Sequence, residues 1–321
     1  MNYRQLTYEQ RIAIHALLKA DHNQTQIAKI IGVSKSTVSR EIKRNTGLKG
    51  YRPKQANQHA LDRRQHAEKH VRFTEEVKNL VNELLKQKWS PEQISGRLKL
   101  LNIATVSHET IYQHVINDQN NGGDLYKNLR QGRKKRRKRI KSKDRRGQIP
   151  NRVSIDKRPV EVDNKERKGD WEVDTIIGQN HKGALVTAVE RKFKFTCISH
   201  VRNKEAHVVA KALIDMLKPY KKFVHTITSD NGKEFAKHQK IAKALNAQFY
   251  FAHPYCAWER GLNENTNGLI RQYFPKKSNL TSVNKEQIID VQNDLNNRPR
   301  KSLDFLTPAE LFLNSFVALG T

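Results

Sequence analysis

The chain has 321 residues, enough for two or three domains, and its 61 Lys and Arg outnumber its 32 Asp and Glu for a formal net charge of +29. So much positive charge would repel itself in a compact protein unless a polyanion neutralises it, which favours a nucleic-acid-binding protein. Two cysteines exclude a disulfide framework and a cysteine-based zinc finger. No apolar run approaches the roughly 18 residues that cross a bilayer, and the N-terminus is polar, so we expect a cytoplasmic protein with no membrane partner.

The N-terminal region predicts three short helices. Thr7 is expected to cap the first, and the second, over 25–31, is expected to end at Gly32. Ser34 then caps a third helix over 35–44, which gives a helix-turn-helix pattern whose last helix can lie in the DNA major groove. The candidate DNA-contacting residues on its outward face are Lys35, Ser36, Thr37, Arg40, Lys43 and Arg44.

A second helical unit is expected over 74–116. Thr74 caps its first helix, and Ser90 caps its second, with proline at the first helical position. The last helix is capped by Ser107 or His108 and exposes polar residues that can read bases. The alternative is a packed linker module without DNA contacts, and the sequence does not choose between them.

The sharpest change in composition falls at 133–146, where basic residues run almost without interruption. Such a block cannot fold alone, so we expect a flexible linker that neutralises phosphates and makes binding sensitive to salt. The candidate DNA-binding residues here are Arg133, Lys134, Lys135, Arg136 and Arg137.

The C-terminal half predicts an α/β domain, because β-branched and aromatic runs replace the helical pattern. The expected strands are 171–177, 184–190, 193–201, 224–229 and 248–252, and the expected helices are 204–220, 237–245, 258–273 and 285–297. Three strands followed by helix, strand, helix, strand and helix is the order of the ribonuclease H-like fold, which has a mixed five-stranded sheet. We therefore predict a multidomain chain with an all-α helix-turn-helix domain at 1–50, a second helical region at 51–130, a basic linker at 131–160 and a ribonuclease H-like α/β domain at 161–321.

Three carboxylates are candidates for a catalytic metal site. Asp174 lies in the first strand of the core, Asp230 ends the fourth in an Asp-Asn-Gly turn, and Glu264 lies on the helix over 258–273. Mg²⁺ and Mn²⁺ prefer such hard oxygen ligands. Two of these ions about 4 Å apart can activate an attacking oxygen and stabilise a leaving one in phosphodiester chemistry.

Other acidic residues compete for these roles. Asp170, Glu172 and Asp174 share one face of an extended strand, so periodicity alone cannot choose among them. Glu259 lies about 140° from Glu264 around the helix, so only one of the two can face the site.

The helix over 258–273 has one apolar and one polar side. Helical periodicity places Trp258 with the apolar residues, and Glu264 on the opposite side with Arg260 and Asn267. Polar side chains near the acidic residues can contact DNA phosphates. These possible substrate contacts are Asn231, Lys233, Arg260, Asn263 and Asn267.

Several short motifs occur in one order along nearly the whole chain. They are STVSRE at 36–41, WSPEQI at 89–94, SHETIY at 107–112, IPNRV at 149–153, GDWEVD at 169–174, SDNGKEF at 229–235, WERGLNEN at 258–265, NRPR at 297–300 and TPAE at 307–310. In this combination the chain resembles transposases of the bacterial IS-thirty insertion-sequence family, whose catalytic domain is similar to retroviral integrases.

The resemblance implies a DDE-type polynucleotidyl transferase, with Asp174, Asp230 and Glu264 as the triad that binds two Mg²⁺ or Mn²⁺ ions. The 33 residues between Asp230 and Glu264 match the family's spacing. The resemblance also implies double-stranded DNA partners, namely the element's terminal inverted repeats and the target DNA.

These transposases cut at the ends of an insertion sequence and join the freed 3′-hydroxyl to target DNA. Holding two ends together implies a homodimer or higher multimer on DNA, located on the bacterial nucleoid. The alternatives are a transposase-derived DNA-binding regulator that no longer cuts, and a nuclease of the same fold that only hydrolyses.

Overall fold

The computed structural model describes residues 5–66, 73–130, 149–254 and 256–317. They belong to two compact units, 1–71 and 72–321, each of which is considered by itself. The predicted DNA contacts Arg133, Lys134, Lys135, Arg136 and Arg137 lie outside the described residues. Among the described residues, no helix has the length and apolar character needed to span a bilayer.

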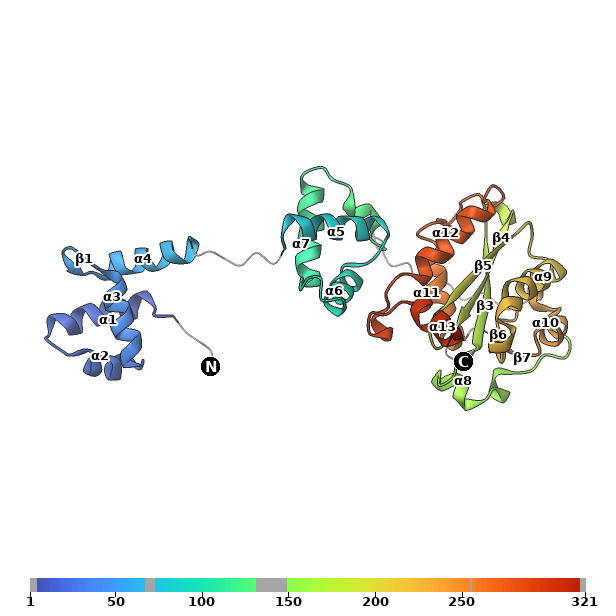
Figure 1. The fold of residues 1–321 in the computed structure, drawn as a ribbon, viewed down its shortest axis with the longest axis horizontal. Helices are drawn as coiled ribbons and strands as arrows, with labels where there is room; N and C mark the ends of the chain where they lie inside the picture. The colour runs from blue at the N-terminus through green and yellow to red at the C-terminus, as the bar shows by residue number, and fades with distance from the viewer. Residues whose placement is uncertain (1–4, 67–72, 131–148, 255, 318–321) are drawn as a thin grey trace. The chain divides into compact units, whose positions relative to one another are not determined.

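The first unit contains the three predicted helices, α1 (Tyr8–Lys19), α2 (Gln24–Ile31) and α3 (Lys35–Asn45) (Figure 1). Local signals set their ends. Thr7 and Asn23 form capping boxes, Ser34 accepts the Thr37 N–H at 3.2 Å, and Gly32 ends α2 with a left-handed φ of 70°. The apolar faces of the three helices meet in one core, which includes Ile14, Ile27 and Val38.

A hairpin and a fourth helix, which the sequence analysis did not predict, complete this unit. They are β1 (Thr46–Gly47), β2 (Gly50–Tyr51) and α4 (Pro53–Gln65). The hairpin brings the Tyr51 hydroxyl to Glu41 at 3.2 Å, and Arg11 donates to the same carboxylate at 2.7 Å. A buried charge on the last helix of the helix-turn-helix is therefore paired within the unit.

The second unit begins with a helical module of α5 (Glu75–Lys86), α6 (Pro91–Leu100), α7 (His108–Asn120) and the short η1 (Leu125–Asn128). Thr74 and Ser90 cap the first two of the longer helices, as predicted, and Ser107, one of the two predicted candidates, caps the third. Val81, Leu85, Ile94, Leu98 and Ile111 form the centre of its core.

The rest of the second unit is built on a five-stranded sheet with strand order β5-β4-β3-β6-β7. The strands are β3 (Asp170–Ile177), β4 (Ala184–Glu190), β5 (Thr196–Val201), β6 (Thr226–Ser229) and β7 (Gln248–Phe251). The first three are antiparallel, and β6 and β7 continue from β3 in parallel. The predicted mixed five-stranded sheet and ribonuclease H-like fold are confirmed.

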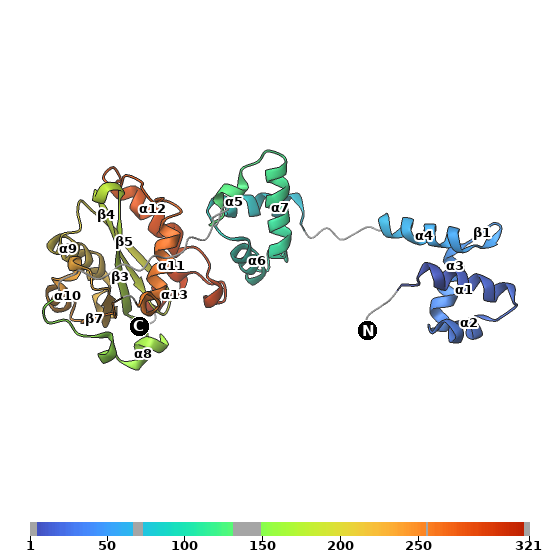
Figure 2. The same ribbon diagram turned by 180° about the vertical axis from the view of Figure 1, so that it is seen from behind.

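Helices cover both faces of this sheet (Figures 1 and 2). On one face α9 (Ala206–Leu217) and α10 (His238–Leu245) pack on alternate strand residues such as Val173 and Val186. On the other face α11 (Gly261–Ile270) and α12 (Lys285–Asn296) pack on Ile176 and Leu185. Because successive side chains of β3 and β4 point to opposite faces of the sheet, these strands contribute to two separate apolar cores.

Shorter elements precede, connect and follow these. They are η2 (Ile155–Lys157), α8 (Val160–Asn164), η3 (Gln179–His181), η4 (Lys218–Phe223), η5 (Lys233–Phe235), η6 (Ala257–Arg260), η7 (Lys301–Leu303) and α13 (Pro308–Val317). Ahead of the sheet, Ile149 is buried in its core and Ser154 bridges to Phe251 in β7.

The helix predicted over 258–273 differs most from the structure. Residues Ala257–Arg260 form a 3₁₀ turn, and α11 begins only at Gly261. The side chain of Trp258, which the sequence analysis placed on the apolar stripe, is 76% exposed. That expectation was wrong, because the 100° spacing of an α-helix does not extend through the 3₁₀ turn.

Candidate active site

Two of the predicted carboxylates meet at one edge of the sheet. In the parallel pair of β3 and β6, Asp170 lies opposite Thr226 and Glu172 lies opposite Thr228. Asp174 is two residues further along β3, and Asp230 directly follows β6. Continued by two residues on each strand, this register brings the two aspartates side by side, where β6 ends and β3 continues.

The guanidinium of Arg260 lies between the two aspartates. Its Nη1 is 3.8 Å from Oδ2 of Asp174, and its Nη2 is 3.6 Å from Oδ2 of Asp230. The Arg260 side chain is 13% exposed, against 22% for Asp174 and 33% for Asp230. One shared cation therefore lies between two carboxylates and offsets part of their negative charge.

Asp174 is held by groups on both of its oxygens. Oδ1 accepts the backbone N–H of Thr175 at 2.8 Å, and Oδ2 accepts the side-chain amide of Asn267 at 2.9 Å. Burial, aided by the charge of Asp230 and opposed by Arg260, raises the pKa of Asp174 to about 6. A carboxyl poised in this way is typical of a functional site.

The Asp-Asn-Gly turn holds Asp230 in place. The Gly232 N–H donates to Oδ1 of Asp230 at 2.9 Å, and the side chain of Asn231 donates to the Ala252 carbonyl at 2.6 Å. A Cβ at Gly232 would lie 2.6 Å from the Glu234 carboxyl group and 2.9 Å from Oδ1 of Asp230, so a larger residue would have to displace these two carboxyl groups. Glu234 in turn accepts the Thr175 hydroxyl at 3.0 Å.

Glu264 lies on the helix beside this pair. It follows Arg260 by four residues and precedes Asn267 by three, and both of those neighbours contact the aspartates. Within α11 the three-residue spacing places Glu264 and Asn267 on one face. Glu264 is exposed, and within the described ranges no three His, Cys, Asp or Glu side chains converge closely enough to hold a metal ion. The structure thus brings Asp174 and Asp230 together and places Glu264 on the adjoining helix face.

Two competing strand acids have other partners. Asp170 is fully buried and accepts from Arg167 at 3.1 Å and from the Thr226 hydroxyl at 2.8 Å. Glu172 is 1% exposed and pairs with the buried Arg191. Neither carboxylate is open to a substrate.

The competing helix acid, Glu259, also has a partner. It accepts from Nδ1 of His253 at 2.7 Å and from the His253 backbone N–H at 2.8 Å. The other ring nitrogen of His253 lies 3.1 Å from Asp156. These hydrogen bonds raise the pKa of His253, Glu259 having the larger effect. Glu259 thus belongs to a separate surface cluster.

The predicted substrate contacts fall into three groups. Arg260 and Asn267 bind the aspartates directly, and Asn231 accepts a hydrogen bond from Arg152. Lys233 is exposed and follows Asp230 by three residues in the sequence. Asn263 is only 1% exposed, and its backbone N–H donates to Glu172 at 3.1 Å. It therefore stabilises the packing of α11 on the sheet and is not open to a substrate. The role of Asn267 in orienting Asp174 depends on a contact between distant segments, which no local sequence signal predicts.

The predicted DNA-reading face of α3 belongs to the first unit. Five of its six candidate residues are exposed and Thr37 is half-buried. Arg40 folds back onto α3 and donates to the Ser36 carbonyl at 3.0 Å. A hollow of about 460 Å³ adjoins this face. Its basic lining residues are Arg11, Arg40, Arg44, Arg63 and Arg64.

Three family models match the chain: a helix-turn-helix domain at 2–45, a homeodomain-like domain at 37–115 and an integrase core domain at 164–257. The helix-turn-helix domains indicate DNA binding, and the integrase core indicates a polynucleotidyl transferase.

Curated relatives span nearly the whole chain. The transposase for insertion sequence element IS4351 of Bacteroides fragilis is 48% identical, over 96% of this chain and 95% of that protein. Transposase InsI for element IS30A of Escherichia coli (strain K12) is 37% identical, over 95% of this chain and 82% of that protein.

A solved structure of the catalytic core domain of BIV integrase is also similar. It is 20% identical, with a TM-score of 0.38, and the match covers 48% of this chain and all of that chain.

Proposed function

Because the chain belongs to the insertion-sequence transposase family, we propose that it binds the terminal inverted repeats of its element, cuts the DNA at the ends and joins the freed 3′-hydroxyl to target DNA. We assign the catalytic and metal-binding roles to Asp174, Asp230 and Glu264. The observation that carries this assignment is the juxtaposition of Asp174, inside β3, and Asp230, at the end of the parallel strand β6, with Arg260 as their shared counter-ion.

A core of the integrase type uses divalent metal ions, and the residues at this edge suit them. Asp174 and Asp230 offer hard oxygen ligands, and the cation that balances them is a displaceable arginine side chain. Glu264, on the same face of α11 as Asn267, supplies the third carboxylate. We propose two Mg²⁺ or Mn²⁺ ions, which when bound activate the attacking oxygen and stabilise the leaving oxygen.

The protein's own groups prepare this site. Asn267 and the Thr175 N–H orient Asp174, and the Gly232 N–H orients Asp230, so that both carboxylates face the same edge. Preorganised groups of this kind lower the cost of reaching the transition state. Arg260 neutralises the carboxylates in the metal-free protein, and we assign it a DNA phosphate as partner once metal is bound.

DNA recognition is assigned to the exposed face of α3 and its neighbouring basic hollow. Because two ends of an element must be held together, we propose that the chain acts as at least a dimer on DNA. We place it on the bacterial nucleoid.

Replacing Glu264 with glutamine should lower the rate of end cleavage about 100-fold while leaving end binding unchanged. Glutamine keeps the size of the side chain and removes the charge that attracts a cation, a loss of about 3 kcal/mol in transition-state stabilisation. The measurement is cleavage and strand transfer on a plasmid that carries both element ends, with Mg²⁺ present.

Glu259→Gln is the matched control, because it makes the same change five residues away on a side chain that binds His253. The control should cut at close to the wild-type rate. Equal cutting by Glu264→Gln and the wild type would remove Glu264 from the triad. If the wild type binds ends and yields no cut product, the chain is instead a DNA-binding regulator.

The metal requirement should depend on pH. Asp174, with its pKa raised to about 6, is protonated below that pH, and a metal ion must displace the proton to bind. Below pH 6 the Mg²⁺ concentration for half-maximal cleavage should therefore rise about tenfold for each pH unit, and above about pH 7 it should level off. Cleavage measured against Mg²⁺ concentration at pH 5, 6, 7 and 8 tests this, and a constant requirement from pH 5 to 7 would contradict it.

A further inference from the structure

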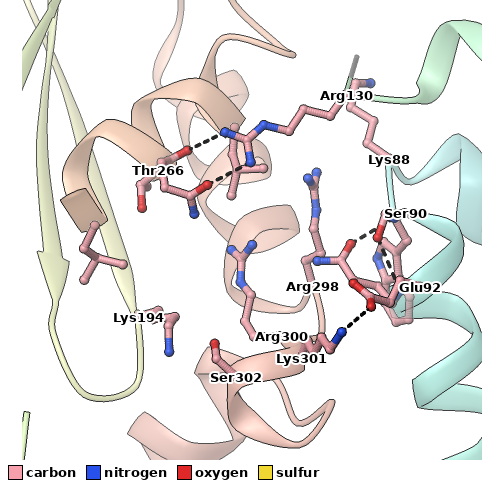
Figure 3. Close-up of a pocket in the computed structure, with 15 residues that line it drawn as sticks. Lys88, Ser90, Glu92, Arg130, Lys194, Thr266, Arg298, Arg300, Lys301 and Ser302 are labelled. Atoms are coloured by element: carbon pink, nitrogen blue, oxygen red, sulfur yellow. Dashed lines mark hydrogen bonds and ion pairs between the residues drawn. The ribbon is translucent and has the colours of Figure 1, made fainter. Parts of the chain in front are cut away.

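The NRPR motif at 297–300 plays no part in the proposed cutting site, yet it lines a cavity of about 410 Å³ (Figure 3). The cavity lies between the junction of α5 with α6 and one face of α11. Its basic lining residues are Lys88, Arg130, Lys194, Arg298, Arg300 and Lys301. Its one acidic lining residue, Glu92, is paired with Lys301 at 2.6 Å.

The two arginines of the motif are buried, and among the described residues neither forms a salt bridge; the charge of Asp294, which is bonded to Tyr273, acts on Arg298 only from beyond that distance. Arg298 is 1% exposed and donates to the Tyr273 hydroxyl at 2.8 Å and to the Gln272 side chain at 2.9 Å. Arg300 is 9% exposed and donates to the Leu295 carbonyl at 2.9 Å. The Nε of each arginine is buried with no hydrogen-bond acceptor in the described structure.

Such an arrangement is costly unless an anion completes it. Removing a guanidinium from water carries a large penalty that a neutral acceptor offsets only in part. Burial, together with the like charges of Arg298 and Arg130, lowers the pKa of Arg300 to about 9. Each of these costs falls when a negative group enters the cavity.

A third guanidinium faces the same space. Arg130 is fixed on α11, where it donates to the side chain of Asn265 at 2.8 Å and to its carbonyl at 3.3 Å. The ends of Arg298 and Arg300 point toward this side chain (Figure 3). Planar guanidinium groups in such a cluster match the oxygens of a phosphate.

We propose that Arg130, Arg298 and Arg300 form a binding site for a phosphate group of the DNA backbone. This rests on the proposed function, which supplies the DNA. A cavity of about 410 Å³ is larger than a single phosphate needs and has room for the adjoining sugar. Its position also matters, because Leu262, Asn265, Thr266 and Leu269 turn one face of α11 to the cavity, whereas Glu264 lies on another. DNA held here therefore contacts the same helix that carries the proposed third metal ligand.

The test compares full-length wild type, Arg300→Gln and Lys301→Gln, the last being a matched control in the same cavity whose cation already has Glu92. The first readout is the unfolding temperature in potassium phosphate against potassium chloride at equal ionic strength. The second is the dependence of end-DNA affinity on salt.

We expect phosphate to raise the unfolding temperature of wild type and Lys301→Gln, but not of Arg300→Gln. We expect the slope of log K against log salt to fall by about 0.9 in Arg300→Gln, the value for one lost phosphate contact.

Unchanged phosphate stabilisation and an unchanged slope in Arg300→Gln would overturn the proposal. Loss of the phosphate effect with an unchanged slope would show a site for free anions and overturn the assignment to DNA. If Arg300→Gln does not fold, Arg130→Gln, whose side chain is exposed, should shift both readouts in the same direction. Failure of the wild type to cut DNA would refute the proposed function without altering either binding readout.

Discussion

Replacing Asp230 with asparagine should reduce cleavage and joining of element ends about 1,000-fold or more, the largest catalytic loss we expect. The change corresponds to about 4 kcal/mol of transition-state stabilisation, within the several kcal/mol that a metal-ligand charge supplies. Asparagine can still accept the Gly232 N–H through its side-chain oxygen, so the turn after β6 should survive. The variant removes the charge and keeps the shape.

The matched control is Asp215→Asn, which makes the same chemical change on the exposed face of α9. Single-turnover cleavage of a labelled end, together with end binding by gel shift, separates a catalytic loss from a binding loss. We expect Asp230→Asn to bind ends at the wild-type level and Asp215→Asn to cut normally. If Asp230→Asn keeps more than a tenth of the wild-type rate, Asp230 is not a metal ligand.

The parts of the fold that the sequence predicted well are those with local signals. Thr7, Ser34 and Ser90 cap helices through bonds to residues three positions away, and Gly32 reaches a left-handed φ that other residues avoid. The run of residues that became β4, Ala184–Glu190, matches the predicted strand at both ends. Because such signals lie within a few residues of each other, they can be read before any tertiary contact is known.

Local sequence signals could not show which acidic residue of β3 belongs to the candidate site. Asp170, Glu172 and Asp174 alternate identically along β3, so a period of two gives them the same side. Their different surroundings depend on distant segments. Arg191, directly after β4, forms an ion pair with Glu172, and Arg260, which follows β7 in the chain, forms one with Asp174. The resemblance to a family pointed to Asp174, and the physical reason for that choice lies in these long-range pairs.

Glu172 has a further use that the sequence did not indicate. Besides pairing with Arg191, it accepts the backbone N–H of Asn263 at 3.1 Å, in the first turn of α11. Arg191 in turn donates to the Val162 carbonyl of α8 at 3.0 Å. This buried chain of contacts links α8, the sheet and the helix that carries Glu264, so it fixes the position of α11 against β3.

Replacing Arg191 with methionine should therefore lower the free energy of unfolding of the second unit by about 3–5 kcal/mol, because Glu172 is left buried and unpaired. Glu172 is 1% exposed and Arg191 is 5% exposed, and burial already raises the pKa of the former and lowers that of the latter. Urea unfolding followed by near-ultraviolet circular dichroism measures the change. The exposed Arg202→Met is the control and should stay within about 0.5 kcal/mol of wild type.

The double variant Arg191→Met with Glu172→Gln distinguishes the cause of this loss. If the penalty comes from the unpaired charge, removing the charge should restore at least half of the lost stability, since a neutral amide can still accept the Asn263 N–H. If the double variant is as unstable as Arg191→Met alone, the arginine instead stabilises the unit through packing and its bond to Val162. Cleavage by the double variant then tests whether a correctly placed α11 needs the ion pair or only the hydrogen bond.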